Sequence, residues 1–346
     1  MDPNVPSERL SEFIRGMPKA ELHLHVEGTL EPEMAFALAR RNGVEIPPDV
    51  ADALRSGRPF TDLQSFLDRY YACSSVLRTE QDFFELAQAY LLRAAADGVI
   101  RAEMFFDPQS HAARGIEAGT VIRGLSRACR EAKDRGLDAA LLLSFLRHLD
   151  EKAAFETLEQ ALPFRDQFIG VGLDSSERGN PPEKFARVFA RCRSLGLHTV
   201  AHAGEEGPPE YIQGALDVLG AERIDHGVRC LEDPALVARL RAARIPLTVC
   251  PLSNVRLRVC DRMEDHPLPR LLEAGLAVSL HSDDPAYFGG YLNQNYLQAC
   301  SALRLDAAQA YRMARNGFEA AFVGAQERQR LLERLEAYSG SMGDRR

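Results

Sequence analysis

The sequence predicts an α/β protein folded as a closed (β/α)₈ barrel of the TIM type. Eight short hydrophobic runs alternate with helix-length segments along the 346 residues, which is the pattern of parallel strands joined by crossover helices. A count of eight strands favours a closed barrel over an open doubly wound sheet. Histidines and acids also gather after the first, fifth, sixth and eighth runs, and barrel closure would bring the first and eighth strands together.

The expected strands are short apolar runs bounded by turn-forming residues, as in parallel strands that are buried on both faces. In chain order they are residues 21–26, 99–106, 139–146, 168–173, 199–203, 223–226, 246–250 and 277–280. A dinucleotide-binding sheet is not expected, because Glu27-Gly28-Thr29 after the first strand lacks the glycine-rich spacing of that fold.

The segments between strands have helical length, and several begin with proline, which suits the first helical turn. Helices are expected at residues 32–41, 118–134, 151–162, 182–194, 209–219, 234–242 and 268–273. A long insertion at about 46–97 contains no strand-like run and is expected to be a helical lid over the barrel mouth. Extra helices are expected at about 291–340, so residues 1–346 are expected to form one domain.

Composition narrows the classes of function. Apolar residues make up 45% of the chain and charged residues 27%, the balance of a globular protein with a large core. The formal net charge of -8 argues against a nucleic-acid partner, and no apolar run of about 18 residues suits a membrane span. Seven cysteines without a CxxC pair indicate reduced thiols and a cytoplasmic location. A homo-oligomer is left open.

Two histidines end the first expected strand. Side chains alternate along a strand, so His23 and His25 point to one face while Leu22 and Leu24 point to the other. Two imidazoles at this spacing form a two-point chelate for a divalent cation. HxH pairs also arise by chance on surfaces, but this one ends a buried strand. His202, at the end of the fifth strand, is the expected third ligand.

Carboxylates accompany these histidines. Asp283 and Asp284 follow the eighth strand and point in different directions, so one can bind the metal while the other meets the substrate. The alternative is that both cap the following helix. Glu205 lies three residues after His202 and can shuttle protons, although a helix-start residue would look similar. His226 ends the sixth strand as either a further ligand or a base that orients the metal hydroxide.

Three histidines and one aspartate with an open position suit Zn(II), and ligand type alone leaves Fe(II) and Mn(II) open. A second metal would need a bridging group near the end of the fourth strand. That strand ends with Asp174, Ser175 and Glu177 and without a lysine to modify. Although Asp174 or Glu177 could bridge, one metal ion per subunit is the simpler expectation.

Four motifs, which occur in order across most of the chain, resemble those of the adenosine/adenine deaminase family: MPKAELHLH at 17–25, HAGE at 202–205, DHG at 225–227 and SDDP at 282–285. The resemblance implies a (β/α)₈ barrel with one catalytic zinc ion. It implies that the zinc ligands are His23, His25, His202 and Asp283. Glu205 would be the proton donor, His226 would assist the zinc hydroxide, and Asp284 would meet the imidazole edge of a purine.

The resemblance also implies a substrate. Family members that act on adenosine usually carry Asp in an HxHxDG stretch, where this chain has the longer Glu27, which could fill the space of a ribose. Residues 174–177 and 281–291 are similar to the adenine deaminase branch, and Ser175 and Glu177 are expected at the pocket. The expected reaction is hydrolysis of adenine to hypoxanthine and ammonia. N6-substituted adenines (cytokinin-type bases) and adenosine are the alternatives.

Two other classes stay open. A catalytically inactive purine-binding relative would be expected to lack a ligand or the acid, whereas this chain keeps all of the motif residues. An unrelated metal hydrolase would act on an amide or phosphoester. Its product would be an acid, whereas a purine deaminase releases ammonia.

Overall fold

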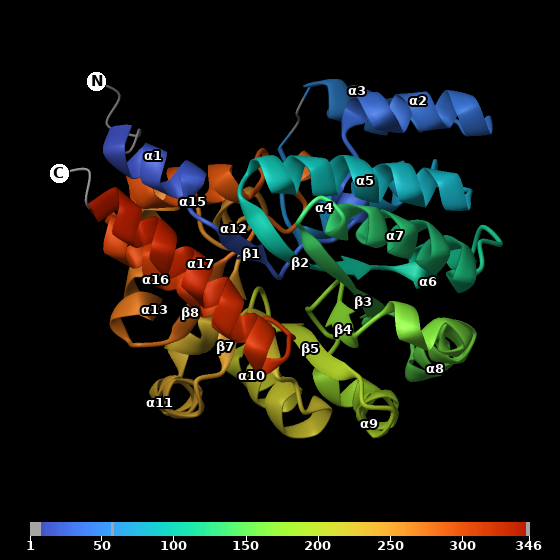
Figure 1. The fold of residues 1–346 in the computed structure, drawn as a ribbon. Helices are drawn as coiled ribbons and strands as arrows, with labels where there is room; N and C mark the ends of the chain where they lie inside the picture. The colour runs from blue at the N-terminus through green and yellow to red at the C-terminus, as the bar shows by residue number, and fades with distance from the viewer. Residues whose placement is uncertain (1–7, 57–58, 344–346) are drawn as a thin grey trace.

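A computed structural model describes residues 8–56 and 59–343 of the protein. Eight parallel strands pair in chain order, with the helices arranged around them (Figure 1). The strands are β1 (Lys19–Glu21), β2 (Val99–Phe106), β3 (Asp138–Leu146), β4 (Gly170–Asp174), β5 (His198–Ala203), β6 (Arg223–His226), β7 (Pro246–Val249) and β8 (Ala277–Leu280). The predicted barrel is confirmed, and the bounds of β2, β6 and β8 match the expected ones.

Isolated bridges join the first strand region to the last. Leu24 pairs with Asp283 in parallel orientation. The backbone N–H of Asp283 donates to the carbonyl of His23, and that of His25 donates to the carbonyl of Asp283, each at 3.0 Å. The regular ladder of β1 ends at Glu21, whereas the predicted strand runs to residue 26. The difference arises because Leu24 and His25 form only isolated bridges. The polar ends of β1 and β8 are thereby fixed side by side.

The helices follow the expected order. They are α1 (Glu8–Gly16), α2 (Pro32–Asn42), α3 (Pro48–Ser56), α4 (Leu63–Ser74), α5 (Glu80–Ala96), α6 (Pro108–Ala112), α7 (Ala118–Lys133), α8 (Glu151–Ala161), α9 (Ala186–Ser194), α10 (Pro209–Gly214), α11 (Pro234–Ala243), α12 (Pro251–Arg256), α13 (Leu268–Glu273), α14 (Pro285–Phe288), α15 (Leu292–Ala302), α16 (Ala307–Ala320) and α17 (Ala325–Gly343). The insertion thus consists of α3, α4 and α5, and the C-terminal region of α15, α16 and α17, which confirms both expectations. Asp62 and Thr79 begin α4 and α5 with capping boxes.

The N-terminal end of the barrel is filled by a buried ion-pair network. Glu103 on β2 accepts hydrogen bonds from Arg223 at 2.8 Å, from Arg101 at 2.9 Å and from the backbone of Phe322 at 2.7 Å. Such buried charges are tolerated because they are paired and hydrogen-bonded. His198, at the start of β5, stacks on Phe322 with ring centroids 4.0 Å apart. This end of the barrel is therefore closed, which leaves the opposite end for a site.

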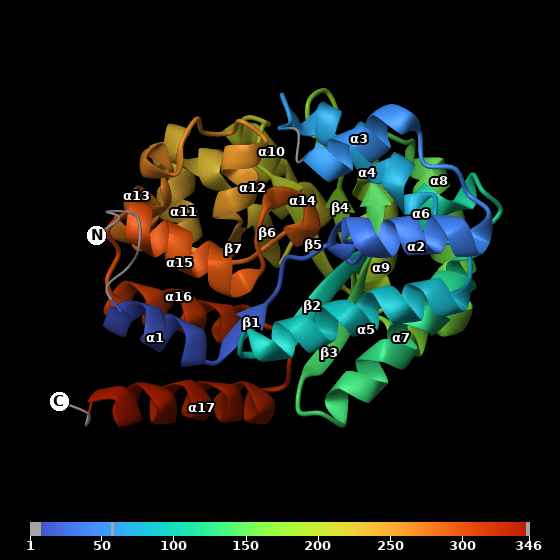
Figure 2. The ribbon, with the colours of Figure 1, turned by 90° about the horizontal axis from the view of Figure 1, so that it is seen from above.

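The two ends of the described chain lie side by side, with α1 next to α17 in both views (Figures 1 and 2). The rings of Phe13 and Tyr338 are 5.7 Å apart. All seven cysteines are free thiols, and a cytoplasmic location stays a prediction. Within the described ranges, none of the helices has the length and apolar character required for crossing a membrane.

Candidate active site

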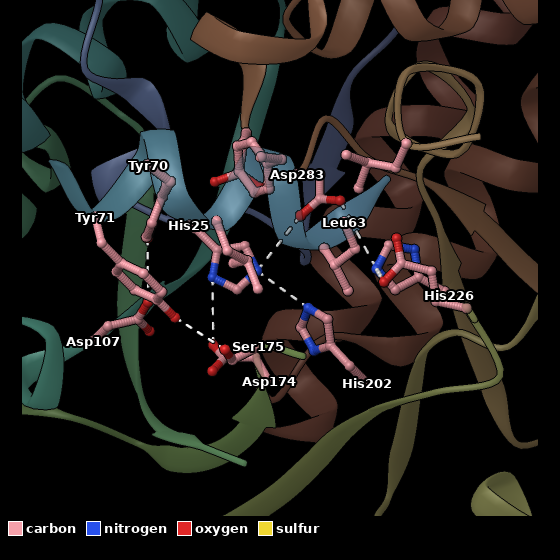
Figure 3. A pocket seen from close by; sticks show the side chains of 15 residues that line it. His25, Leu63, Tyr70, Tyr71, Asp107, Asp174, Ser175, His202, His226 and Asp283 are labelled. Atoms are coloured by element: carbon pink, nitrogen blue, oxygen red, sulfur yellow. Dashed lines mark hydrogen bonds and ion pairs between the residues drawn. The ribbon is translucent and has the colours of Figure 1, made fainter. Parts of the chain in front are cut away.

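Four potential ligands from three strand regions, His23, His25, His202 and Asp283, meet at the C-terminal end of the barrel. Figure 3 shows three of them, His25, His202 and Asp283. Nε2 of His202 lies 3.1 Å from Nε2 of His23 and 3.1 Å from Nε2 of His25. Oδ1 of Asp283 lies 3.4 Å and 3.5 Å from the same atoms of His23 and His25. Metal–ligand distances of about 2.0–2.2 Å in a tetrahedral site place neighbouring donor atoms about 3.3–3.6 Å apart. The observed spacings of 3.1–3.5 Å are close to this range, so the four atoms can bind one divalent cation.

The outer nitrogen of each of these three histidines faces an oxygen acceptor. The pairs are His23 Nδ1 with the carbonyl of Thr248 at 3.0 Å, His25 Nδ1 with Asp174 Oδ2 at 3.5 Å, and His202 Nδ1 with Asp225 Oδ2 at 3.5 Å. An acceptor at this position favours a proton on Nδ1, which leaves the Nε2 lone pair free for a metal.

Glu205 lies beside this cluster in the loop after β5. Its side chain is buried, its Oε1 atom has no hydrogen-bond partner within the described chain, and its Oε2 atom lies 3.6 Å from Nε2 of His226. Burial raises the pKa of Glu205 well above its usual range, and the charges of Asp283 and Glu177 raise it further. The raised pKa favours the protonated form of Glu205, which can donate a proton.

One carboxylate holds the loop that carries Glu205. Oε1 of Glu177 accepts the N–H of Gly204 at 2.7 Å, and its Oε2 accepts those of Glu205, Glu206 and Gly207 at 3.1, 2.8 and 2.7 Å. The expectation that Glu177 lines the pocket is not met, because its carboxylate is turned to these four donors and is absent from the cavity wall described below.

The backbone turns sharply at His226 and at Asp283. Both have left-handed backbone conformations, with φ of 66° and 62°, which non-glycine residues rarely adopt outside functional sites. Nε2 of His226 faces Asp283 Oδ2 at 3.8 Å, and its Nδ1 faces Nδ2 of Asn254 at 3.4 Å. These turns aim both side chains at the ligand cluster.

Asp284 is the second buried acid of the site. Burial raises its pKa well above the usual range, and the neighbouring Asp283 raises it further. Its Oδ1 atom has no hydrogen-bond partner among the described residues. A Cβ atom on Gly28 would lie 1.9 Å from this oxygen, so the close approach requires glycine. Asp284 can therefore donate a hydrogen bond to a ligand.

These groups surround one cavity of about 390 Å³, its open mouth included. Helix α4 supplies part of the wall through Leu63, Phe66, Leu67, Tyr70 and Tyr71, and Figure 3 shows both tyrosines reaching in from this helix. The predicted position of the insertion over the barrel mouth is thus confirmed.

The α4 tyrosines are tied to the barrel. Tyr70 donates to Asp107 Oδ2 at 3.2 Å. The hydroxyl oxygens of Tyr71 and Ser175 are 3.0 Å apart, and Nδ1 of His148 lies 2.9 Å from the same Ser175 oxygen. Ser175 lines the cavity.

Glu27 differs from its expectation. Its carboxylate is fully buried and accepts hydrogen bonds from the backbone of Asp107 at 3.2 Å and from His111 at 2.9 Å. It is not among the cavity-lining residues of the described chain. Asp107 itself lines the cavity and was missed by the sequence reasoning. The signal was present, because an Asp-Pro pair follows the predicted strand 99–106 as it does the eighth strand.

Comparisons with known proteins agree with this geometry. An adenine deaminase of Trichlorobacter lovleyi is 60% identical over 337 residues, covering 97% of both chains. The crystal structure of an adenine deaminase from Arthrobacter aurescens matches with 50% identity and a TM-score of 0.91, covering 94% of this chain and 99% of that one. An amidohydrolase from Burkhoderia ambifaria with bound Zn matches with 27% identity and a TM-score of 0.89, covering 99% of both chains. The sequence profile described as adenosine deaminase matches residues 18–338, and the chain therefore belongs to the adenosine deaminase family.

Proposed function

We propose that this protein is a zinc-dependent adenine deaminase, which hydrolyses adenine to hypoxanthine and ammonia. The observation that carries the proposal is the placement of two buried acids, Glu205 and Asp284, beside a four-donor metal cluster in one cavity, where burial raises the pKa of both. The names of the similar proteins from Trichlorobacter lovleyi and Arthrobacter aurescens support the substrate.

The donor set suits one zinc ion per subunit. The residues that would hold it are His23, His25, His202 and Asp283, three imidazoles and one carboxylate, which are ligand types that zinc prefers. When bound, zinc acts as a Lewis acid that makes hydroxide available at neutral pH. The bound Zn of the Burkholderia ambifaria relative supports this choice of metal.

The two acids match the acceptors of a purine ring. With C6 at the metal cluster, Glu205 donates its proton to N1 and so neutralises the negative charge that develops on the ring. Asp284, held in its acid form by burial, donates a hydrogen bond to N7 on the imidazole edge. Water supplies the hydroxide that adds to C6, and its other proton restores the acid form of Glu205. The hydrogen on the new C6 oxygen then passes to the amino group, the C6–N6 bond breaks and ammonia leaves, so that adenine and water give hypoxanthine and ammonia.

The walls of the cavity favour the free base. Tyr70 and Tyr71 line the cavity and are anchored on Asp107 and Ser175. A ribose would bring hydroxyl groups that need partners there, and an N6-alkyl group would need room beside the metal cluster.

The test is a parallel ultraviolet assay of the zinc-loaded protein with adenine, adenosine and N6-isopentenyladenine. Adenine is expected to be turned over with the highest kcat/KM. Preference for adenosine would overturn the argument from the cavity walls, and preference for the N6-substituted base would move the function to cytokinin-type bases. No turnover of any of the three by the metal-loaded protein would refute the proposed function. Glu206→Gln, which alters the neighbouring acid, is the control variant and should remain active.

A further inference from the structure

We propose that Asn254 and His266 hold the imidazole of His226 in the neutral tautomer that carries its proton on Nε2. His226 would then act as a hydrogen-bond donor to the attacking oxygen, not as a metal ligand or a general base. The catalytic half of this inference rests on the proposed function, whereas the tautomer does not. Asn254 follows β7 in α12, and His266 precedes α13, so both are positioning residues on elements separate from β6.

The chain of hydrogen bonds starts at a backbone group. The N–H of Leu268 donates to Nδ1 of His266 at 3.1 Å. A backbone N–H can only donate, so Nδ1 of His266 carries no proton. Burial lowers the pKa of His266 to about 4, and the ring is therefore neutral at pH 7. Its one ring proton is then on Nε2.

His266 in turn fixes the orientation of an amide. Its Nε2–H donates to Oδ1 of Asn254 at 3.0 Å. The other end of the amide, Nδ2, therefore faces Nδ1 of His226 at 3.4 Å. An amide nitrogen donates and does not accept, so Nδ1 of His226 must be the acceptor and the ring proton of His226 must be on Nε2.

Burial keeps water from replacing the hydrogen bonds of this relay, which runs from His266 through Asn254 to His226. Asn254, His226 and His266 are 0%, 1% and 3% exposed. The backbone carbonyl of Asn254 also accepts the N–H groups of Val259 at 2.9 Å and Cys260 at 3.1 Å, which fixes the position of the amide. Buried polar groups at such sites are held by specific partners because leaving them unpaired is costly.

The far side of the His226 ring supports the same assignment. Nε2 faces two carboxyl oxygens, Oε2 of Glu205 at 3.6 Å and Oδ2 of Asp283 at 3.8 Å. A proton on Nε2 is attracted to the carboxylate of Asp283, whereas a bare lone pair would be repelled by it.

The four histidines of the site thus differ in whether an acceptor or a donor faces their Nδ1 atom. His23, His25 and His202 each turn Nδ1 toward an oxygen acceptor, which frees Nε2 to bind a metal. His226 alone among these four turns Nδ1 toward a donor, which occupies its Nε2 with a proton. A second group of donor atoms within metal-binding reach, formed by His23, His226, Cys250 and Asp283, is therefore not the metal site.

The consequence for the reaction is a defined role for His226. Its Nε2–H donates to the oxygen that attacks C6 and so orients a lone pair of that oxygen toward the ring. Because Nδ1 is already occupied as an acceptor, His226 keeps its proton and takes none from the water. The proton delivered to N1 comes from Glu205.

The tautomer can be read directly from the imidazole ¹⁵N resonances of the zinc-loaded protein labelled at histidine. An unprotonated nitrogen resonates well downfield of a protonated one, and coupling to the ring protons tells Nδ1 from Nε2. We expect His226 to show a bare Nδ1 and a protonated Nε2. A protonated Nδ1, or a metal-bound Nε2, in the unmodified protein would overturn the inference without the use of any variant or substrate.

Asn254→Asp tests the cause, because it replaces the donor that faces Nδ1 with an acceptor. We expect His226 to gain a proton on Nδ1. We also expect kcat for adenine to fall about 10- to 100-fold, the range typical of changes to residues that hydrogen-bond to the histidines of a metal site. The KM and the zinc-to-protein ratio should stay near those of the unmodified protein. An unchanged tautomer in this variant would refute the relay.

Two further variants serve as controls. Asn316→Asp alters a buried amide that donates to the carbonyl of Val278 at 2.7 Å, outside the site, and should leave the His226 resonances and kcat unchanged. If Asn254→Asp does not fold, His266→Phe removes the donor that orients the amide and should give signals of both His226 tautomers, whereas a single unchanged tautomer would refute the relay. If the resonances are as expected but adenine is not turned over, the proposed function fails while the tautomer assignment stands.

Discussion

Glu177→Gln should both destabilise the protein and slow the reaction, although Glu177 does not line the cavity. The substitution keeps the shape of the side chain but removes its charge. Oε1 of Glu177 accepts one backbone N–H and Oε2 accepts three. The favoured orientation of the glutamine keeps oxygen toward the group of three and places its NH₂ group against the N–H of Gly204.

The magnitude follows from these four contacts. One buried donor left facing another donor costs about 1–3 kcal/mol, and three charge-assisted hydrogen bonds become neutral ones, each weaker by about 1 kcal/mol. Burying a neutral amide instead of a carboxylate offsets part of this sum. We expect the free energy of unfolding to fall by about 2–4 kcal/mol. The loop that carries Glu205 would also lose its fixed position, and a displacement on the order of 1 Å is expected to lower kcat about 100-fold.

The assay combines thermal unfolding with steady-state kinetics on adenine. At this chain length each kcal/mol corresponds to a change of about 2 °C in Tm, so a drop of about 4–8 °C is expected together with the loss of kcat. The matched control is Glu206→Gln on the same loop, where Glu206 pairs with the exposed Arg178 at 3.3 Å. Such an ion pair contributes about 0–1 kcal/mol. Equal effects of the two substitutions, or a normal kcat for Glu177→Gln, would refute the reasoning.

Three further predictions concern the acid, the metal and pH. Glu205→Gln should retain zinc, as measured by atomic absorption, and lose nearly all turnover, because the variant has no proton to deliver to N1; loss of the metal from the folded variant would contradict the assigned role. His23→Ala should lose zinc and activity, and removal of zinc from the unmodified protein by a chelator should lower its Tm, since ligand binding to the native state alone is stabilising; a chelator-insensitive Tm would argue against a bound metal. Burial raises the pKa of Glu21 to about 8 from its usual value of about 4.5, so the folded state holds a proton that the unfolded chain releases. Stability should therefore fall as pH rises from about 4.5 to 8, with a slope of up to about 1.4 kcal/mol per pH unit. Denaturant titrations of the unmodified protein and Glu21→Gln should differ in this slope, and identical slopes would contradict the raised pKa.

The fold could be predicted because its strands have a strong local pattern. The eight residues of β2 are all buried, and six of them are apolar, with Arg101 and Glu103 as the exceptions, so the sequence marks the strand with its correct bounds. The bounds of the first strand were harder to predict. Beyond Glu21, isolated bridges pair Leu24 with Asp283, after β8, and His25 with Phe105 on β2. Such pairing depends on distant parts of the chain, and the local sequence does not reveal it.

The metal cluster and the two acids could be located because each follows a strand and carries a distinctive residue type. The roles of Glu27 and Glu177 could not, because a carboxylate near a site looks the same in the sequence whether it faces the cavity or the backbone behind it. The hydrogen bonds to His111 and to the loop at 204–207 decide this. Asn254 and His266 were missed for a related reason, since the direction of their hydrogen bonds depends on the backbone of Leu268.

The contact between the first and last strands has a consequence for how the molecule opens. The bridge of Leu24 to Asp283 and its two flanking hydrogen bonds join residues that also carry three of the four potential metal ligands. A bound ion would therefore cross-link the first and last strand regions of the barrel, whose contact at residues 23–25 and 283 we call the seam. It would link segments about 260 positions apart in the 346-residue chain. Amide hydrogen exchange at residues 23–25 and 283 should accelerate first when the metal is withdrawn, before exchange in the central strands. The seam would thus be both the catalytic centre and the weakest line of the metal-free fold.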